Sequence, residues 1–338
     1  MQVGTVIFEW MLLKNKNIKL LVNYGIGPLL FCWLAFSICK QVAHQPNLHA
    51  AISSITASIT GPQSWKIWLA AALVPLNWGI EARKWQVLVK RLEPISLFTA
   101  LKAVLAGLAF SMNTPNRIGE FGGRMMYIHE GHRWKAFALS IVAGYSQLMV
   151  TLLMGMTGMS FVLLAPVHLT ADFRLWLRIM FYGTAIVSLL LLVLYLRLAF
   201  VTRWIDRLPG ADKYAKHLAT IEALPVTILL RTISLSFLRY FIFVFQYILF
   251  LQLFGVDAAA FTLFWLIGIL YLVLAVIPTI ALAEAGIRGQ VSLLLFSLVS
   301  NNKLGIVGAA TSIWFLNLVL PAIPGSILFL RLKIFQDK

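Results

Sequence analysis

The chain has 338 residues, of which 60% are hydrophobic and only 12% are charged, and its formal net charge is +16. Soluble globular proteins carry about 25% charged residues, so this composition excludes an ordinary soluble domain and indicates a polytopic membrane protein. The lysines and arginines lie in short links beside apolar runs, which is typical of membrane orientation rather than of binding to nucleic acid.

Apolar runs of about 20 residues are long enough to cross a bilayer as helices. Six such runs predict full transmembrane helices near residues 20–39, 66–82, 136–160, 177–199, 229–253 and 304–330. The polar links between them are too short to fold as a separate domain. The sequence therefore predicts an all-α protein in which residues 1–338 form a single transmembrane domain.

Two shorter apolar runs, 97–113 and 261–281, are each followed by another short helical stretch. If 97–113 crossed the membrane, the basic link 200–224 would be external, against the rule that cytoplasmic links carry the excess of lysine and arginine. If residues 97–130 enter from the cytoplasm and return, every basic cluster and both termini are cytoplasmic. The same reasoning makes 261–299 a second re-entrant half-helix hairpin, which enters from the outside.

Three crossings separate the two hairpins, an odd number, so the predicted repeats 97–165 and 261–330 are inverted relative to each other. Phe98-Thr99 precedes the first hairpin as Phe261-Thr262 precedes the second. Inverted repeats with broken helices that meet near the middle of the membrane are a common plan among transporters.

Each hairpin carries a charged motif in otherwise apolar sequence. Residues 114–124 contain Arg117, Glu120 and Arg124, and residues 278–288 contain Glu284 and Arg288. Both Glu–Arg pairs have i,i+4 spacing, which places the two side chains on one helix face within reach of an ion pair. Charge within a membrane is costly and indicates a functional site.

Two interpretations of these motifs remain open. The amide end of a half-helix carries partial positive charge and binds anions, so with the arginines beside it the first motif suits a phosphate. Alternatively, each Glu–Arg pair neutralises itself and only locks its hairpin. Arg239, inside the run 229–253, either adds a second anion contact that lines a cavity or extends toward the membrane surface.

The end of the second run, residues 77–85, has a simpler interpretation. Trp78 and Trp85 resemble an interfacial aromatic belt, and Arg83-Lys84 resembles a solvated cytoplasmic stop. In the alternative interpretation, Glu81 faces the helix bundle. His129 and His132 are one position short of the His-x-x-x-His spacing that binds zinc, and we expect no metal and no cofactor.

The pattern Pro115-x-x-x-Gly119-Glu120 with Arg124, after a short apolar run, resembles the lysylphosphatidylglycerol synthase transmembrane region, also called the flippase-like domain family. Residues 278–288 correspond to a later Pro/Gly/Glu segment of that family, although Ala-Leu-Ala-Glu-Ala-Gly replaces its Pro-Gly-Gly-x-Gly pattern. The resemblance extends over about residues 20–330. It implies passage or handling of a phospholipid or a polyprenyl-linked glycolipid, without the aminoacyl-transferase domain that would imply lipid lysylation.

These observations together predict a non-enzymatic lipid flippase or transporter in the plasma (inner) membrane of a bacterium. Its partner would be a membrane lipid with an anionic or phosphate-containing head group. The residues expected to contact that head group at a mid-membrane site are Arg117, Glu120, Arg124, Arg239, Glu284 and Arg288. Two alternatives stand beside this prediction: a membrane-embedded enzyme acting on a lipid carrier, with Glu120 as general base, and a non-catalytic scaffold for a lipid-modifying enzyme.

Overall fold

The computed structural model describes Phe36 and residues 61–112, 114, 117–164, 170–196, 224–277 and 281–329. Apart from Phe36, the predicted first helix lies outside the described residues, and so do both cysteines and nearly all of the basic link 200–224. So do Pro115 and Pro278, the two prolines of the charged motifs.

Every regular element in the described part of the chain is a helix, which confirms the all-α polytopic class. In chain order these are α5 (Ser64–Val89), α6 (Leu97–Ser111), α7 (Gly119–Met125), η3 (Glu130–His132), α8 (Arg133–Leu164), α9 (Ala171–Leu196), α12 (Val226–Leu253), α13 (Ala260–Val276), α14 (Ala281–Phe296), α15 (Lys303–Trp314), the π-helical segment η4 (Phe315–Val319) and α16 (Leu320–Phe329). The last three form one continuous helical run.

Four of these stretches are long and apolar enough to cross a membrane: Glu130–Leu164, Ala171–Tyr195, Val226–Leu253 and Lys303–Leu328. They coincide with four of the predicted spans. The predicted span 66–82 corresponds to α5, which continues to Val89 instead of ending at Arg83-Lys84. Arg83 and Lys84 therefore lie within the helix and not after it.

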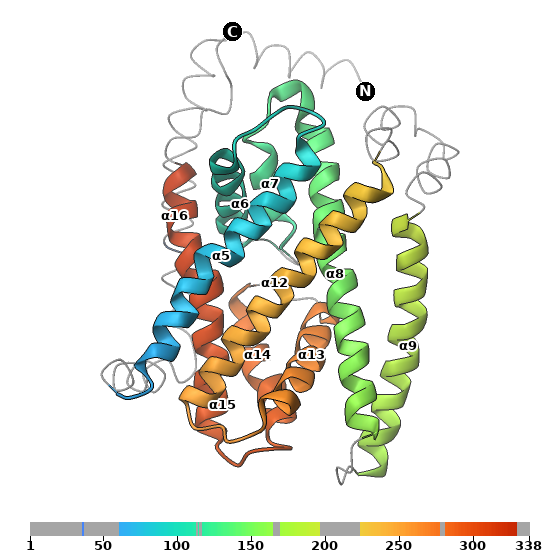
Figure 1. Ribbon diagram of the computed structural model, residues 1–338, viewed down its shortest axis with the longest axis vertical. Coiled ribbons are helices and arrows are strands. Elements are labelled where there is room, and N and C mark those ends of the chain that lie inside the picture. Colours follow the sequence, from blue (N-terminus) through green and yellow to red (C-terminus); the bar gives the residue numbers. More distant parts are fainter. Residues whose placement is uncertain are drawn as a thin grey trace.

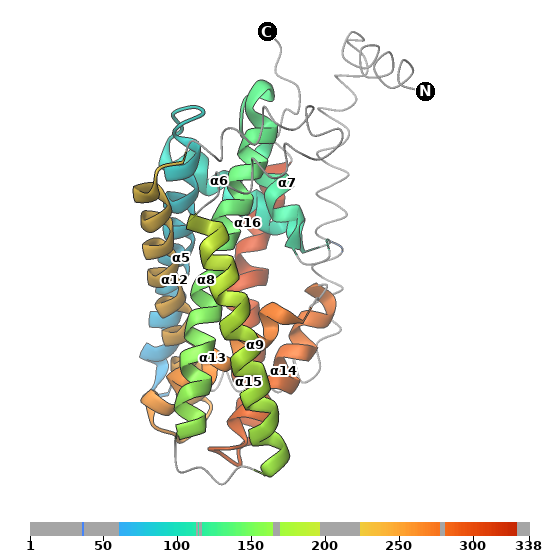
Figure 2. The same ribbon diagram turned by 90° about the vertical axis from the view of Figure 1, so that its right-hand side faces the viewer.

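The two short helical pairs occupy opposite halves of the molecule. The long helices α5, α8 and α12 run along its length, with α6 and α7 together toward one end and α13 and α14 toward the other (Figures 1 and 2). Their order along the chain agrees with the two predicted hairpins. Entry of the hairpins into a membrane from opposite faces remains a prediction.

Glycines allow close packing between α8 and α13 and between α16 and α6. On α8, a Cβ atom added at Gly158 would lie 2.6 Å from the Trp265 carbonyl oxygen on α13. On α16, a Cβ atom at Gly325 would overlap the Leu105 carbonyl oxygen on α6. The long helix that follows each short pair therefore packs on the first short helix of the other pair.

Candidate functional site

The second half of α5 places one carboxylate at the centre of a buried ion cluster. Glu81 is only 2% exposed. Its Oε1 atom accepts a hydrogen bond from Arg124 Nη2 of α7 at 2.8 Å. Its Oε2 atom lies 2.8 Å from Lys84 Nζ and 2.9 Å from Arg239 Nη1 of α12. Arg124 also pairs with Glu120. We call these five residues the Glu81 cluster.

Helix α7 can carry Arg124 into the interior because it lies directly against α6. A Cβ atom added at Gly123 would lie 2.6 Å from the Gly107 Cα atom, so a larger residue would separate the two helices. The Gly119 N–H group donates to the Thr114 hydroxyl at 2.8 Å, which satisfies one free amide at the start of the helix. The glycines of the first motif therefore position its arginine.

Arg239 connects the cluster to a chain of buried amides. Its Nε atom donates to Asn77 Oδ1 at 2.9 Å. Asn77 donates to Asn317, and Asn317 donates to Gln246 Oε1 at 3.1 Å. The Arg239 guanidinium carbon also lies 5.0 Å from the ring centroid of Trp78, within cation–π range. Arg239 therefore extends into the bundle, and the alternative that it reaches toward the membrane surface is wrong.

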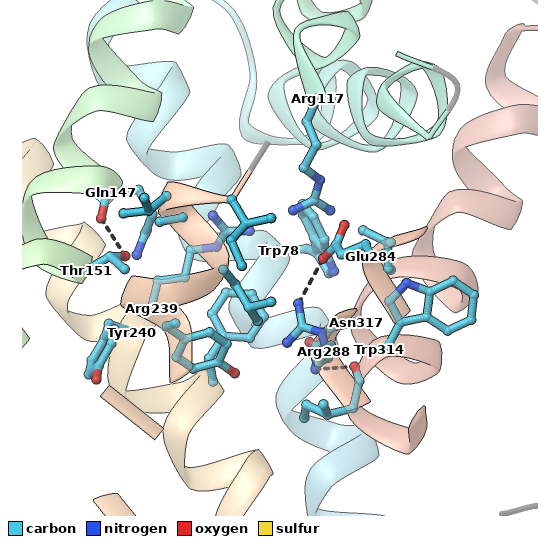
Figure 3. Close-up of a pocket in the computed structure, with 18 residues that line it drawn as sticks. Trp78, Arg117, Gln147, Thr151, Arg239, Tyr240, Glu284, Arg288, Trp314 and Asn317 are labelled. Carbon is cyan, nitrogen blue, oxygen red and sulfur yellow. Dashed lines mark hydrogen bonds and ion pairs between the residues drawn. The ribbon is translucent and has the colours of Figure 1, made fainter. Parts of the chain in front are cut away.

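A cavity of about 470 Å³ lies beside the cluster and receives residues from both charged motifs (Figure 3). Arg117 of the first motif extends into it toward Glu284 of the second (Figure 3). Glu284 forms an ion pair with Arg288 on α14, with Oε1 and Nη2 2.8 Å apart. Arg239 contributes a third cation to the lining, and the rest of the wall is largely aromatic and aliphatic.

The cluster and the cavity together contain more cations than carboxylates. The five cations are Lys84, Arg117, Arg124, Arg239 and Arg288, and the three carboxylates are Glu81, Glu120 and Glu284. Full ionisation gives a net charge of +2 for this set. Buried charge is costly unless it is paired, so an anion in the cavity would be stabilised by the excess.

The structure brings four of the six predicted site residues to the cavity: Arg117, Arg239, Glu284 and Arg288. The other two, Glu120 and Arg124, do not line it. They belong to the Glu81 cluster and reach the cavity indirectly, because Arg124 binds Glu81 and Glu81 binds Arg239. Contact of any of the six with a ligand remains a prediction.

The simpler interpretation of residues 77–85 is wrong for Trp78, Lys84 and Trp85, whereas Arg83 is exposed as it predicted. Lys84 is 1% exposed and bound to Glu81, so it is no solvated stop. Trp85 is fully buried and donates to the Ser140 hydroxyl at 3.0 Å, so it is no interfacial belt residue. Trp78 is also buried. The inward orientation of these side chains could have been predicted from the sequence, because positions 77, 78, 81, 84, 85 and 88 have the spacing of one helix face.

Comparison with known proteins adds one finding. The family model described as Lysylphosphatidylglycerol synthase TM region matches residues 26–325. This range includes every residue of the Glu81 cluster and of the cavity. No curated protein and no solved structure matches the chain.

Proposed function

Because the chain belongs to the lysylphosphatidylglycerol synthase TM region family, its role concerns membrane lipids, and we propose that it translocates a lipid with an anionic head group. The head group, that of a phospholipid or a polyprenyl-linked glycolipid, would pass through the cavity while the apolar tails stay in the surrounding lipid. The protein would act in the plasma membrane of a bacterium with both termini in the cytoplasm.

The observation that carries this proposal is the convergence of both charged motifs on one cavity with excess positive charge. Arg117, Arg239 and Arg288 line the space together with a single described carboxylate, that of Glu284. Guanidinium groups bind phosphate oxygens strongly. The volume of about 470 Å³ lies within the range of about 300–1,000 Å³ that is usual for small-molecule sites.

The packing between the two predicted repeats supports a transport mechanism. We propose that residues 97–165 and 261–330 are inverted repeats that move against each other around the cavity. The packing of α8 on α13 and of α16 on α6 supports this arrangement, because each repeat then contacts the short helix of the other. Movement at these two contacts would expose the cavity first to one membrane face and then to the other.

The geometry gives no support to the alternative in which Glu120 is the general base of a lipid-carrier enzyme. Its carboxylate is bound to Arg124 and does not line the cavity. A base must lie within hydrogen-bonding reach of the proton that it removes. No observation in the described part of the chain favours the scaffold alternative either.

The proposal is tested in proteoliposomes by measuring how fast the head group of a fluorescent anionic lipid becomes accessible to a reagent that cannot cross the membrane. Arg117→Gln and Arg288→Gln should each slow this exchange at least tenfold. Arg178→Gln, an exposed arginine on α9, is the matched control and should exchange at the wild-type rate. Wild-type exchange in both cavity variants would exclude the cavity as the route.

A further inference from the structure

A second pocket, of about 570 Å³, lies between the end of α5, the link to α6 and the first turns of α12. Four of its lining side chains are basic: Arg83, Lys90, Arg91 and Arg231. The described residues that line it include no carboxylate, and none of them lines the cavity. We call this pocket the basic groove.

Local structure places three of these cations at or near the end of α5. Lys90 and Arg91 directly follow the end of α5, where the carbonyl end of a helix favours positive charge, and Arg83 lies within the helix before that end. Arg83 Nη1 donates to Gln86 Oε1 at 2.6 Å. Gln86 Nε2 in turn donates to the Ile95 carbonyl oxygen at 2.8 Å, which fixes the link against α5.

The charges of the groove differ in kind from those of the Glu81 cluster. In that cluster each cation is buried and paired with a carboxylate. Arg83, Lys90 and Arg231 are exposed, and no ion pair joins them to any described carboxylate. Their positive charge is therefore available to an external anion.

The groove also has apolar walls and lies at one end of the bundle. Val87, Ile95 and Ile228 line it beside the cations. The same end of the molecule contains the start of α8 (Figure 1), where the Trp134 side chain is 62% exposed. Exposed tryptophan is typical of the membrane–water interface. A soluble anion needs no apolar wall, whereas a lipid presents its phosphate beside its apolar chains.

We propose that the basic groove is a binding site for the phosphate group of an anionic phospholipid that is held at the membrane surface. Basic pockets between transmembrane helices are known to bind anionic head groups. This site is separate from the proposed translocation route, because the groove and the cavity share no lining residue.

The test uses the full-length protein and counts bound lipids by native mass spectrometry, with phosphatidylglycerol as the anionic probe and phosphatidylcholine as the zwitterionic one. Each basic side chain near an anionic head group contributes about fivefold to affinity. Arg83→Gln/Arg231→Gln should therefore weaken retention of phosphatidylglycerol about 25-fold, and Arg83→Lys/Arg231→Lys should retain it. Retention of phosphatidylcholine should not change.

Two controls make the result specific. Arg174→Gln/Arg178→Gln removes two exposed arginines from α9 and should leave retention unchanged; an equal loss there would show a general charge effect and overturn the site. The groove comparison is repeated in the Arg288→Gln background, which impairs the proposed cavity site. A groove effect that vanishes in this background, or full displacement of the lipid by inorganic phosphate at equal concentration, would also overturn it.

Discussion

Arg239 and Glu81 are 158 positions apart in the chain, yet Arg239 Nη1 donates to Glu81 Oε2 at 2.9 Å. Arg239 also lines the cavity, whereas the other members of the Glu81 cluster do not. The guanidinium group of Arg239 is therefore the link between the ion cluster and the space proposed for the head group. Substitutions of cluster residues outside the cavity should act on stability first, and substitutions of residues that line the cavity should also act on transport.

Glu81→Gln should destabilise the protein strongly. The substitution leaves Lys84 and Arg239 buried without a carboxylate, although Arg124 retains Glu120. Removing one partner from a buried ion pair costs about 3–5 kcal/mol. Thermal unfolding in detergent measures the loss. Glu130→Gln, at an exposed position in η3, should change stability by less than about 0.5 kcal/mol, and equal stability of the two variants would contradict the cluster.

Lys84→Gln and Arg83→Gln form a matched pair of neighbours. Lys84 is buried and bound to Glu81, whereas Arg83 is exposed and bonds only to Gln86 among the described residues. A hydrogen bond to a charged group contributes about 1.5–3 kcal/mol, so Lys84→Gln should lose about that much stability. Arg83→Gln should lose almost none. If the two variants unfold alike in detergent, Lys84 is not held by Glu81.

Four of the six predicted spans coincide with helices that are long and apolar enough to cross a membrane, because a run of about 20 apolar residues has few alternatives to a membrane span. The sequence also predicted the Glu284–Arg288 and Glu120–Arg124 pairs, since an i,i+4 spacing is local information. The centre of the cluster could not be found in this way. The partners of Glu81 on α7 and α12 are 43 and 158 positions away, and only the packing of the three helices brings them together.

The wrong prediction for Lys84 and the two tryptophans has a related cause. A run of charges beside tryptophans is typical of a helix end at the membrane surface, which predicts a solvated side chain for Lys84 as well as for Arg83, and only Arg83 is exposed. The helix instead continues, and the face with Trp78, Glu81 and Lys84 turns inward. The ion-pair partners of Glu81 on α7 and α12 come from distant parts of the chain, which a local pattern does not reveal.

Single cysteines test the predicted topology in a background without Cys32 and Cys39. Cysteines at Thr170, Asp257 and Asn301 should react with an impermeant thiol reagent in intact cells, and one at Lys135 should be protected. Two of these links are in contact, because Asn302 Nδ2 donates to the Phe254 carbonyl oxygen at 2.8 Å. Labelling of only one of positions 257 and 301 would be incompatible with this contact. Labelling at position 135 would show that the orientation in the membrane is the reverse of the predicted one.

Two glycines in the second half of the chain should respond oppositely to alanine. A Cβ atom at Gly325 would overlap the Leu105 carbonyl oxygen, so α16 and α6 must separate, at a cost of about 1–3 kcal/mol. A Cβ atom at Gly286 on α14 meets nothing within 4 Å, and helical Gly→Ala gains about 0.5–1 kcal/mol. Thermal unfolding in detergent should rank Gly286→Ala above wild type and Gly325→Ala below it.

The second motif offers a test between its two interpretations, a head-group site and a self-neutralising lock. Arg288→Gln leaves Glu284 buried without its ion-pair partner, so both stability and lipid transport should fall. Glu284→Gln/Arg288→Gln removes both charges and should recover most of the lost stability, because an uncompensated buried charge is the larger part of the cost. The transport rate of the double variant in proteoliposomes then decides between the head-group site and the self-neutralising lock. If Arg288 binds the head group, the double variant stays at least tenfold slower than wild type although it is stable. If the pair only locks the hairpin, transport recovers together with stability, and the cavity would have no need of that arginine.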